Sequence, residues 1–122
     1  MRAQAPAAEE TFKKFSQAVL VDGYTILSVS PQNLFVETDW RPAKDNEKSE
    51  AEKKLKGASI DAKVTIKLER RGMMYDVLIT PSLRYSGDGP EQQLVADIHH
   101  PLRTKWERVL STFIQKEAKE ED

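Results

Sequence analysis

Residues 59–80 read SIDAKVTIKLERRGMMYDVLIT, and this stretch decides the fold. Apolar and polar residues alternate over residues 59–69, which is typical of a strand with one buried and one solvated face. Residues 70–72 are expected to turn the chain, so that residues 73–80 return as a second strand. Pro81 is expected to end or bend that strand, because proline has no N–H for a sheet ladder, with an extension along an edge over residues 83–85 as the alternative. The buried face of the first strand would carry Ile60, Ala62, Val64, Ile66 and Leu68.

A shorter hairpin is predicted upstream of the long one. Residues 24–29 (YTILSV) are rich in β-branched and aromatic residues, and residues 34–40 (LFVETDW) read as the returning strand. The intervening residues 31–33 (PQN) are typical of a turn. The core face of the returning strand would carry Leu34, Val36, Thr38 and Trp40.

Helices are predicted at both ends of the chain. The first runs from Pro6 or Ala8 to Val21, with Asp22-Gly23 as the stop signal, and the last either opens at Pro101 or is kinked there. A short helix is also expected over residues 91–100. The apolar stripe of the first helix is Phe12, Phe15, Val19 and Leu20, and that of the last is Leu102, Trp106, Val109, Leu110, Phe113 and Ile114.

These elements predict one α+β domain: a helix, a four-stranded antiparallel sheet made of two hairpins, and a C-terminal helix, with both helices on one sheet face. We expect residues 1–7 to be a disordered tail, residues 8–115 to form the domain, and residues 116–122 to be a charged tail. Residues 41–57 are expected to be a mobile charged loop with one or two helical turns near 49–55, because few of them are apolar.

Composition excludes several classes of function. The 122 residues include 19 Lys plus Arg and 20 Asp plus Glu, and this balance argues against a general nucleic-acid binder. There is no Cys, which excludes disulfides, thiol catalysis and thiolate metal sites. No run approaches the roughly 20 apolar residues that a membrane helix needs.

No stretch of the sequence predicts a catalytic, cofactor or metal site. His99 and His100 follow Asp97, but adjacent helix positions point about 100° apart and no second cluster would complete a metal site. Glu37 and Asp39 alternate on one strand face with no positioning residues around them, and a solvated face is the expectation. No nucleophile elbow or glycine-rich phosphate loop is present. The chain is therefore expected not to be an enzyme and to need no cofactor.

The helix, the hairpin ending in Glu37-Thr38-Asp39-Trp40, the charged loop and the alternating stretch 63–80 together resemble a known family. They are similar to the helix-grip domains of the BamC-like lipoproteins, which belong to the outer-membrane β-barrel assembly machinery of Gram-negative bacteria. The resemblance covers roughly residues 12–114. It implies a non-enzymatic envelope domain that acts as a protein-interaction scaffold. Two features depart from the family: the chain has no lipid-acceptor Cys, and it contains one such domain without the family's extended partner-binding segment.

Four residues are candidate partner contacts: Trp40, Arg70, Arg71 and Met73. Trp40 would pack against a helix or cover the open end of the sheet, with a surface anchor for a partner as the alternative. Met73 is adaptable enough for a contact surface, although methionine is more commonly core filler. An unpaired edge strand is a further route to a partner, by strand addition.

The sequence leaves three functions open. The first is the envelope scaffold, with an envelope assembly component as partner. It would be periplasmic and outer-membrane associated if a signal peptide was removed, with membrane association only through an anchor that these residues lack. The second is a cytoplasmic binding module such as a small acidic secretion chaperone, which would form a dimer. The third is a small ligand-binding helix-grip protein, which would need a cavity between sheet and helix.

Overall fold

The computed structural model describes residues 2–55 and 57–120, with the side chains of residues 8–55 and 57–114, and has the expected α+β class. The helices are α1 (Ala5–Val21), α2 (Glu50–Lys53) and α3 (Pro101–Glu120), and two 3-10 turns are η1 (Pro31–Asn33) and η2 (Asp45–Glu47). The strands are β1 (Arg2–Gln4), β2 (Ile26–Ser30), β3 (Phe35–Thr38), β4 (Arg41–Pro42), β5 (Ser59–Arg71), β6 (Met74–Ser86) and β7 (Gln92–Val95).

The sheet has more strands than the four expected. Its order is β1-β6-β5-β3-β2, with β4 also paired to β5 and β7 also paired to β6, so that the described residues form seven strands. Every pairing is antiparallel. The extra strands are short pieces that lie beside the ends of the long β5–β6 hairpin, and short pieces carry too few residues to show an alternating pattern.

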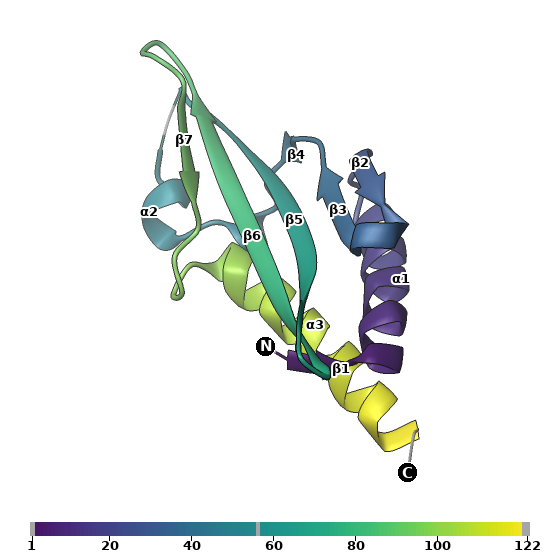
Figure 1. Ribbon diagram of the computed structural model, residues 1–122. Helices are drawn as coiled ribbons and strands as arrows, with labels where there is room; N and C mark the ends of the chain where they lie inside the picture. Colours follow the sequence, from purple (N-terminus) through teal and green to yellow (C-terminus); the bar gives the residue numbers. More distant parts are fainter. Residues whose placement is uncertain (1, 56, 121–122) are drawn as a thin grey trace.

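The β5–β6 hairpin is the longest pairing of the sheet, as residues 59–80 predict (Figure 1). Its turn is at Gly72 and Met73 and not at residues 70–72 as expected, because Arg70 and Arg71 still pair with Tyr75 and Met74. Burial alternates along β5 as expected, with the even-numbered residues 60–68 buried. β6 continues through Pro81 to Ser86, so the strand does not end at Pro81 and the alternative extension over residues 83–85 is present. The backbone groups of successive strand residues face opposite sides, and the position where Pro81 lacks an N–H faces away from β5. On that side, the Pro81 carbonyl accepts a hydrogen bond from the Ala96 N–H.

α1 and α3 pack together on one side of the sheet (Figure 1). One core cluster joins the buried face of β5 to both helices, and Phe15 of α1 meets Trp106 of α3 edge-on, with ring centroids 5.5 Å apart. Leu20, which the sequence assigned to the apolar stripe of the first helix, is exposed instead. The central α1 contacts, Phe12, Phe15 and Val19, are buried as expected.

Three further expectations are corrected. Residues 91–100 form β7 and a turn and not a short helix, because β7 pairs with the end of β6 across a turn. Residues 2–4 form β1 and α1 begins at Ala5, where a disordered tail was expected. At the other end α3 continues to Glu120, while residues 121–122 lie outside the described residues.

Residues 41–57 were expected to be a mobile loop, but the described part is ordered and partly buried. The expected helical turn is present as α2, which a capping box between Ser49 and Glu52 begins. Glu47 and Glu52, which read as solvated charges in the sequence, are buried and hold the segment against the core.

Candidate functional site

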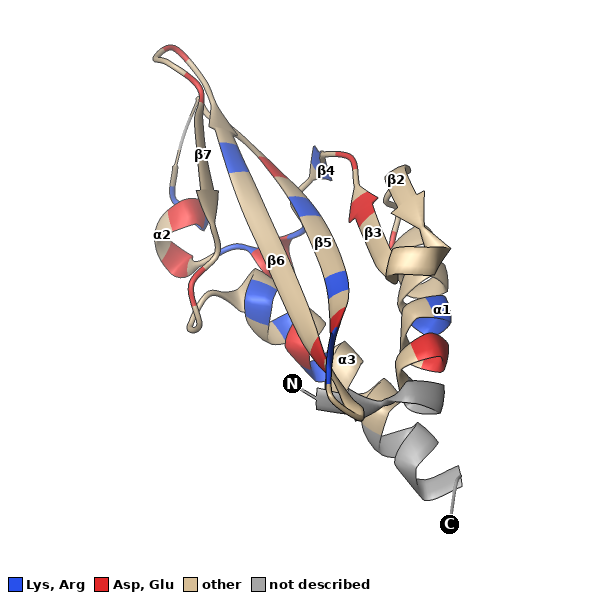
Figure 2. Cartoon of the chain, viewed as in Figure 1, with Lys and Arg blue, Asp and Glu red and all other residues tan. Residues whose placement is uncertain are grey.

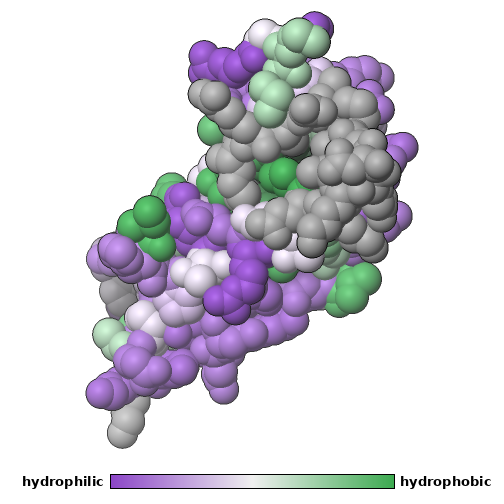
Figure 3. Space-filling model, turned by 90° about the horizontal axis from the view of Figure 1, so that it is seen from below, coloured by the Kyte–Doolittle hydropathy of each residue, from purple (hydrophilic) through white to green (hydrophobic). Residues whose placement is uncertain are grey.

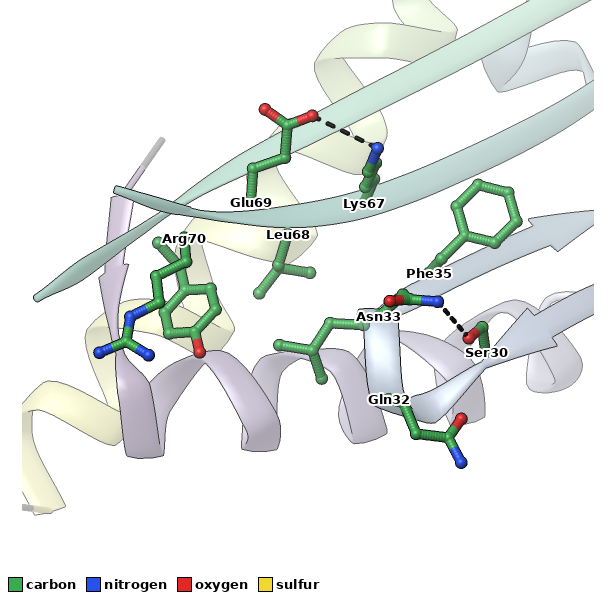
Figure 4. Close-up of a pocket in the computed structure, with 10 residues that line it drawn as sticks. Ser30, Gln32, Asn33, Phe35, Lys67, Leu68, Glu69 and Arg70 are labelled. Atoms are coloured by element: carbon green, nitrogen blue, oxygen red, sulfur yellow. Dashed lines mark hydrogen bonds and ion pairs between the residues drawn. The ribbon is translucent and has the colours of Figure 1, made fainter. Parts of the chain in front are cut away.

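A wedge-shaped pocket of about 540 Å³ opens between η1 and the β5–β6 hairpin (Figure 4). Its volume is within the range of small-molecule sites, about 300–1,000 Å³. Both apolar and polar side chains line it: Ser30, Gln32, Asn33, Leu34, Phe35, Lys67, Leu68, Glu69, Arg70 and Tyr75.

The wedge exists because β3 is shorter than β5. β3 pairs with β5 from Glu37 to Phe35, and a last backbone bond joins the Leu68 N–H to the Leu34 carbonyl at 3.0 Å. The chain before Leu34 is turned away in η1, and Leu34 itself has the left-handed backbone conformation with φ 49°. β5 runs on to Arg71, and none of the described strands lies beside it on this side.

The backbone of Arg70 faces this open position. The N–H groups of Val64 and Leu68 both point toward β3, so alternation along the strand points the Arg70 N–H and C=O the same way. Within the described part of the chain, neither group has a backbone partner on this side. The wedge thus lies where a continuation of β3 would pair with β5.

The side chain of Arg70 is the one cation of the wedge without a carboxylate among the described residues. Its Nε donates to the Gly72 carbonyl at 3.1 Å, whereas Lys67 pairs with Glu69 at 3.4 Å. The wedge lining therefore carries one more positive than negative charge. Figure 4 shows Arg70 on one side of the opening and Gln32 and Asn33 on the other.

Three of the four candidate contacts lie near the hairpin turn. Arg70 lines the wedge, and the Arg71 Nε donates to Asp76 at 3.0 Å. Met73 lies in the turn with 89% of its surface exposed. The structure separates the fourth candidate, Trp40, from this group.

Trp40 was expected on the core face, and that prediction is wrong. Arg41 lies six positions after Phe35 in the chain, but its partner Ala62 lies only five positions from Lys67, so residues 39–40 contain a β-bulge. The one-residue shift moves the indole to the solvated face of the sheet. It lies there beside the Lys63 Nζ and Arg84 Cζ, which are 5.3 Å and 4.8 Å from its ring centroid.

Charged side chains on the sheet surface pair with one another. On the sheet face without helices, β5 carries charges of both signs (Figure 2), and Lys63 pairs with Glu37 and Arg84 with Asp61. Glu37 was a candidate carboxylate, and this ion pair occupies it. Seen from below, the described surface is mostly hydrophilic, with its hydrophobic residues in separate patches (Figure 3).

A buried ion cluster fastens residues 41–47 to both helices. Arg41 donates to both oxygens of Glu47, at 2.7 and 2.6 Å, and to Asp22 at 2.6 Å. Lys105 of α3 donates to Glu47 at 2.8 Å and to Asp22 at 3.0 Å. Burial alone would raise the pKa of the Glu47 carboxyl, but the hydrogen bonds from Arg41 and Lys105 outweigh it and hold that pKa below its usual range.

An aromatic pair lines the same cluster. The Arg41 guanidinium lies 3.9 Å from the ring centroid of Tyr24, and Tyr24 packs against Trp106. Burial, followed by the negative charge of Glu47, raises the pKa of the Tyr24 hydroxyl. The cluster is a packed junction of loop and helices, with both carboxylates occupied by cations.

A second polar cluster holds α2. Glu52 accepts hydrogen bonds from the Tyr85 hydroxyl and the Ser49 N–H, and its Oε1 lies 2.8 Å from His100 Nε2. The Leu102 N–H donates to His100 Nδ1, so that Nε2 carries the ring proton and donates to Glu52. His100 is thus a bridge between α2 and α3.

The remaining candidate ligands stay apart. His99 is exposed, and its backbone N–H donates to Asp97. Among the described residues, no group of three or more His, Asp or Glu could hold a metal ion.

Most residues of the wedge were not singled out by the sequence. Only Arg70 was named as a candidate, while the turn at 31–33 was predicted without its role as a wall. The signal that could have found the wedge is the mismatch between a short strand at 34–40 and its much longer partner at 59–71.

Comparison with known proteins adds no family. No protein-family model matches the chain, and a search of the curated proteins found no match either. In the described residues, no helix combines the length and the apolar character that crossing a membrane requires.

Proposed function

We propose that this chain is a non-enzymatic interaction domain that binds a protein partner at the wedge between η1 and the β5–β6 hairpin. The observation that carries the proposal is the open position beside Arg70. Within the described residues, three features meet there: backbone groups without a partner, apolar side chains, and a guanidinium that no carboxylate pairs. Binding sites combine such apolar surface with a few polar groups that fix orientation.

The use of the ionisable groups supports binding over catalysis. The carboxyls whose pKa is lowered are Asp22, Glu47 and Glu52, and none of them lines the wedge. Each is fixed by hydrogen bonds from neighbouring side chains, which is an arrangement for stability. A catalytic carboxyl would instead lie in the cleft with access to a substrate.

The resemblance to BamC-like lipoproteins supports a periplasmic, outer-membrane-associated location. A chain of this type would act at the periplasmic side of the outer membrane, held by an anchor outside these residues, with an envelope assembly component as partner. Fractionation of cells that express the complete gene tests this part: recovery in the outer-membrane fraction supports it, and recovery in the cytoplasm contradicts it.

A photo-crosslinking pair tests the binding face in living cells. A photoreactive amino acid at Gln32, on the rim of the wedge, is expected to give a discrete adduct that Arg70→Glu removes. The same amino acid at the exposed Gln92 of β7 is the matched control and is expected to give no such adduct. Equal adducts at both positions, or an adduct insensitive to Arg70→Glu, would contradict the proposal.

The exposed edge of the sheet favours a second candidate, a dimeric binding module. β2 is an edge strand, residues 23–36 contain no charged residue, and Leu27 and Val29 are exposed. Edge strands of monomers are commonly protected by charges, so an uncharged edge suits pairing with a second chain. Light scattering decides: a dimer that Val29→Lys dissociates supports this candidate, and a monomer at high concentration excludes it.

A further inference from the structure

We infer that the wedge takes an extended acidic peptide segment, which pairs with β5 as a short continuation of β3. This inference rests on the proposed function and names the chemistry of the partner. The segment would lie opposite residues 69–71 of β5, with a Glu or Asp side chain beside Arg70.

The backbone geometry selects an extended chain over a helix or a compact molecule. β5 presents the N–H and C=O of Arg70 into the open position, and a neighbouring strand would satisfy both. Strand residues are about 3.3 Å apart, so residues 69–71 offer room for roughly three paired residues. The Leu34 carbonyl already accepts the last bond of the existing ladder, which fixes where the guest strand must stop.

The direction of the Arg70 side chain determines which side chain of the bound peptide would meet it. Arg70 shares the inner face with Leu68, and its cross-strand neighbour on β6 is Tyr75. A guest residue opposite Arg70 would project on that same inner face, so its side chain would meet the guanidinium and the Tyr75 ring. A carboxylate there is charge-complementary, because no described carboxylate pairs with Arg70.

The adjacent arginine supplies a matched control. Arg71 follows Arg70 in the chain, projects on the opposite face of the strand, and is already paired with Asp76 and Glu69. The two arginines have the same chemistry and nearly the same position, but only Arg70 faces the wedge.

The test uses NMR titration of the whole chain with the acetylated and amidated peptide Thr-Val-Glu-Val-Thr and its Gln and Lys counterparts. β-branched residues favour the extended conformation. We expect weak binding, with a dissociation constant on the order of 1 mM, and shifts concentrated at the amides of residues 33–35 and 68–71. The Glu peptide should bind roughly two- to fivefold tighter than the Gln peptide, as for an exposed ion pair.

Substitutions then assign the preference to one side chain. Arg70→Gln is expected to abolish the difference between the Glu and Gln peptides, and Arg71→Gln to leave it unchanged. Arg70→Glu should reverse the order, so that the Lys peptide binds tightest. Equal effects of the two Gln variants, or shifts centred elsewhere on the molecule, would overturn the inference.

Two further outcomes separate this inference from the proposed function. If acetate alone produced the same amide shifts as the Glu peptide, the wedge would be an anion site and strand pairing would be disproved. If no peptide bound while the Gln32 adduct still formed in cells, the partner would use the wedge without strand addition. Loss of that adduct as well would remove the proposed function itself.

Discussion

At the scale of single residues, some charged side chains that the sequence places in solvent are buried in the fold. Glu47 belongs to a segment of seventeen mostly polar residues, 41–57, yet its side chain is fully buried. A buried carboxylate is tolerated only when cations and hydrogen bonds compensate it, and Arg41 and Lys105 provide both. Arg41 lies six positions before Glu47, but Lys105 lies 58 positions after it, so no local sequence pattern indicates that the three side chains meet.

Replacing Glu47 with Gln is expected to lower the free energy of unfolding by about 3 kcal/mol. The value is at the lower end of the range for a broken buried pair, because Asp22 still accepts from both cations. Urea unfolding followed by circular dichroism measures the change. Asp45→Asn, at a nearby side chain that is 95% exposed, is the control and should stay within about 0.5 kcal/mol of the parent. A loss of equal size in both variants would show that the cluster is not the cause.

The same cluster gives the protein a defined response to acid. Burial opposes ionisation of Asp22 and Glu47, but the hydrogen bonds from cations dominate and lower the pKa of both carboxyls in the folded state. A lowered folded pKa contributes stability above the unfolded value, near 4, and that contribution is lost as the pH falls through the folded value. The free energy of unfolding should therefore be nearly constant from pH 7 to 5 and fall below about pH 4. The fall should be smaller in Glu47→Gln, and stability that rose on acidification would refute the assignment.

At the scale of elements, the accuracy of the sequence reading follows the length of the periodic pattern. The β5–β6 hairpin and the α3 stripe, whose Leu102, Trp106 and Leu110 are buried, were predicted because each repeats its period several times. β4 and β7 were missed because they have two and four residues, and pairing with β5 and β6 decides their conformation. The face of Trp40 was wrong because a single-residue bulge leaves no trace in an alternating pattern.

The wedge illustrates the same limit. Its wall at 31–33 was predicted as a turn and Arg70 was named as a contact, but their proximity depends on where β3 stops pairing with β5. The register of two strands is set by the turn geometry and the hydrophobic pattern together, and only the hydrophobic pattern can be read directly from the sequence. The candidate site was therefore predictable in part of its residues and not in its shape.

Cleavage by trypsin is expected to report how α2 is held. The segment carries Lys53 and Lys54, and Glu52 fastens it through Tyr85 and His100. Glu52→Ala should accelerate cleavage after these lysines by roughly 5- to 30-fold, which corresponds to a loss of about 1–2 kcal/mol of local stability.

The control for this experiment is Glu50→Ala. Glu50 lies in the same short helix with its side chain 82% exposed, and among the described residues its ion pair is with Lys53. Its removal should leave the cleavage rate nearly unchanged. Rapid cleavage already in the parent protein would show that residues 41–57 are as mobile as their composition indicates, and that the Glu52 cluster does not hold them.

At the scale of the whole molecule, one core connects both layers. Trp106 and Leu110 of α3 are buried in the same cluster as Phe15 of α1 and Val64 and Ile66 of β5, so neither layer can separate without exposing the other. A single-domain chain with one shared core is expected to unfold in one cooperative step. The polar clusters at Glu47 and Glu52 extend that coupling to the segment between the hairpins.

Leu110→Ala tests this coupling, and we expect it to lower the free energy of unfolding by about 2–5 kcal/mol through loss of buried surface and the cavity that remains. In a Trp40→Phe background, fluorescence reports the buried Trp106 alone, while far-ultraviolet circular dichroism reports helices and sheet together. The two denaturation curves should coincide in the parent and shift together in the variant. Leu20→Ala, at an exposed leucine of α1, should shift neither by more than about 0.5 kcal/mol. Curves that separated in the parent would mean that α3 and the sheet unfold independently, and the shared core would then not be the unit that keeps the wedge in shape.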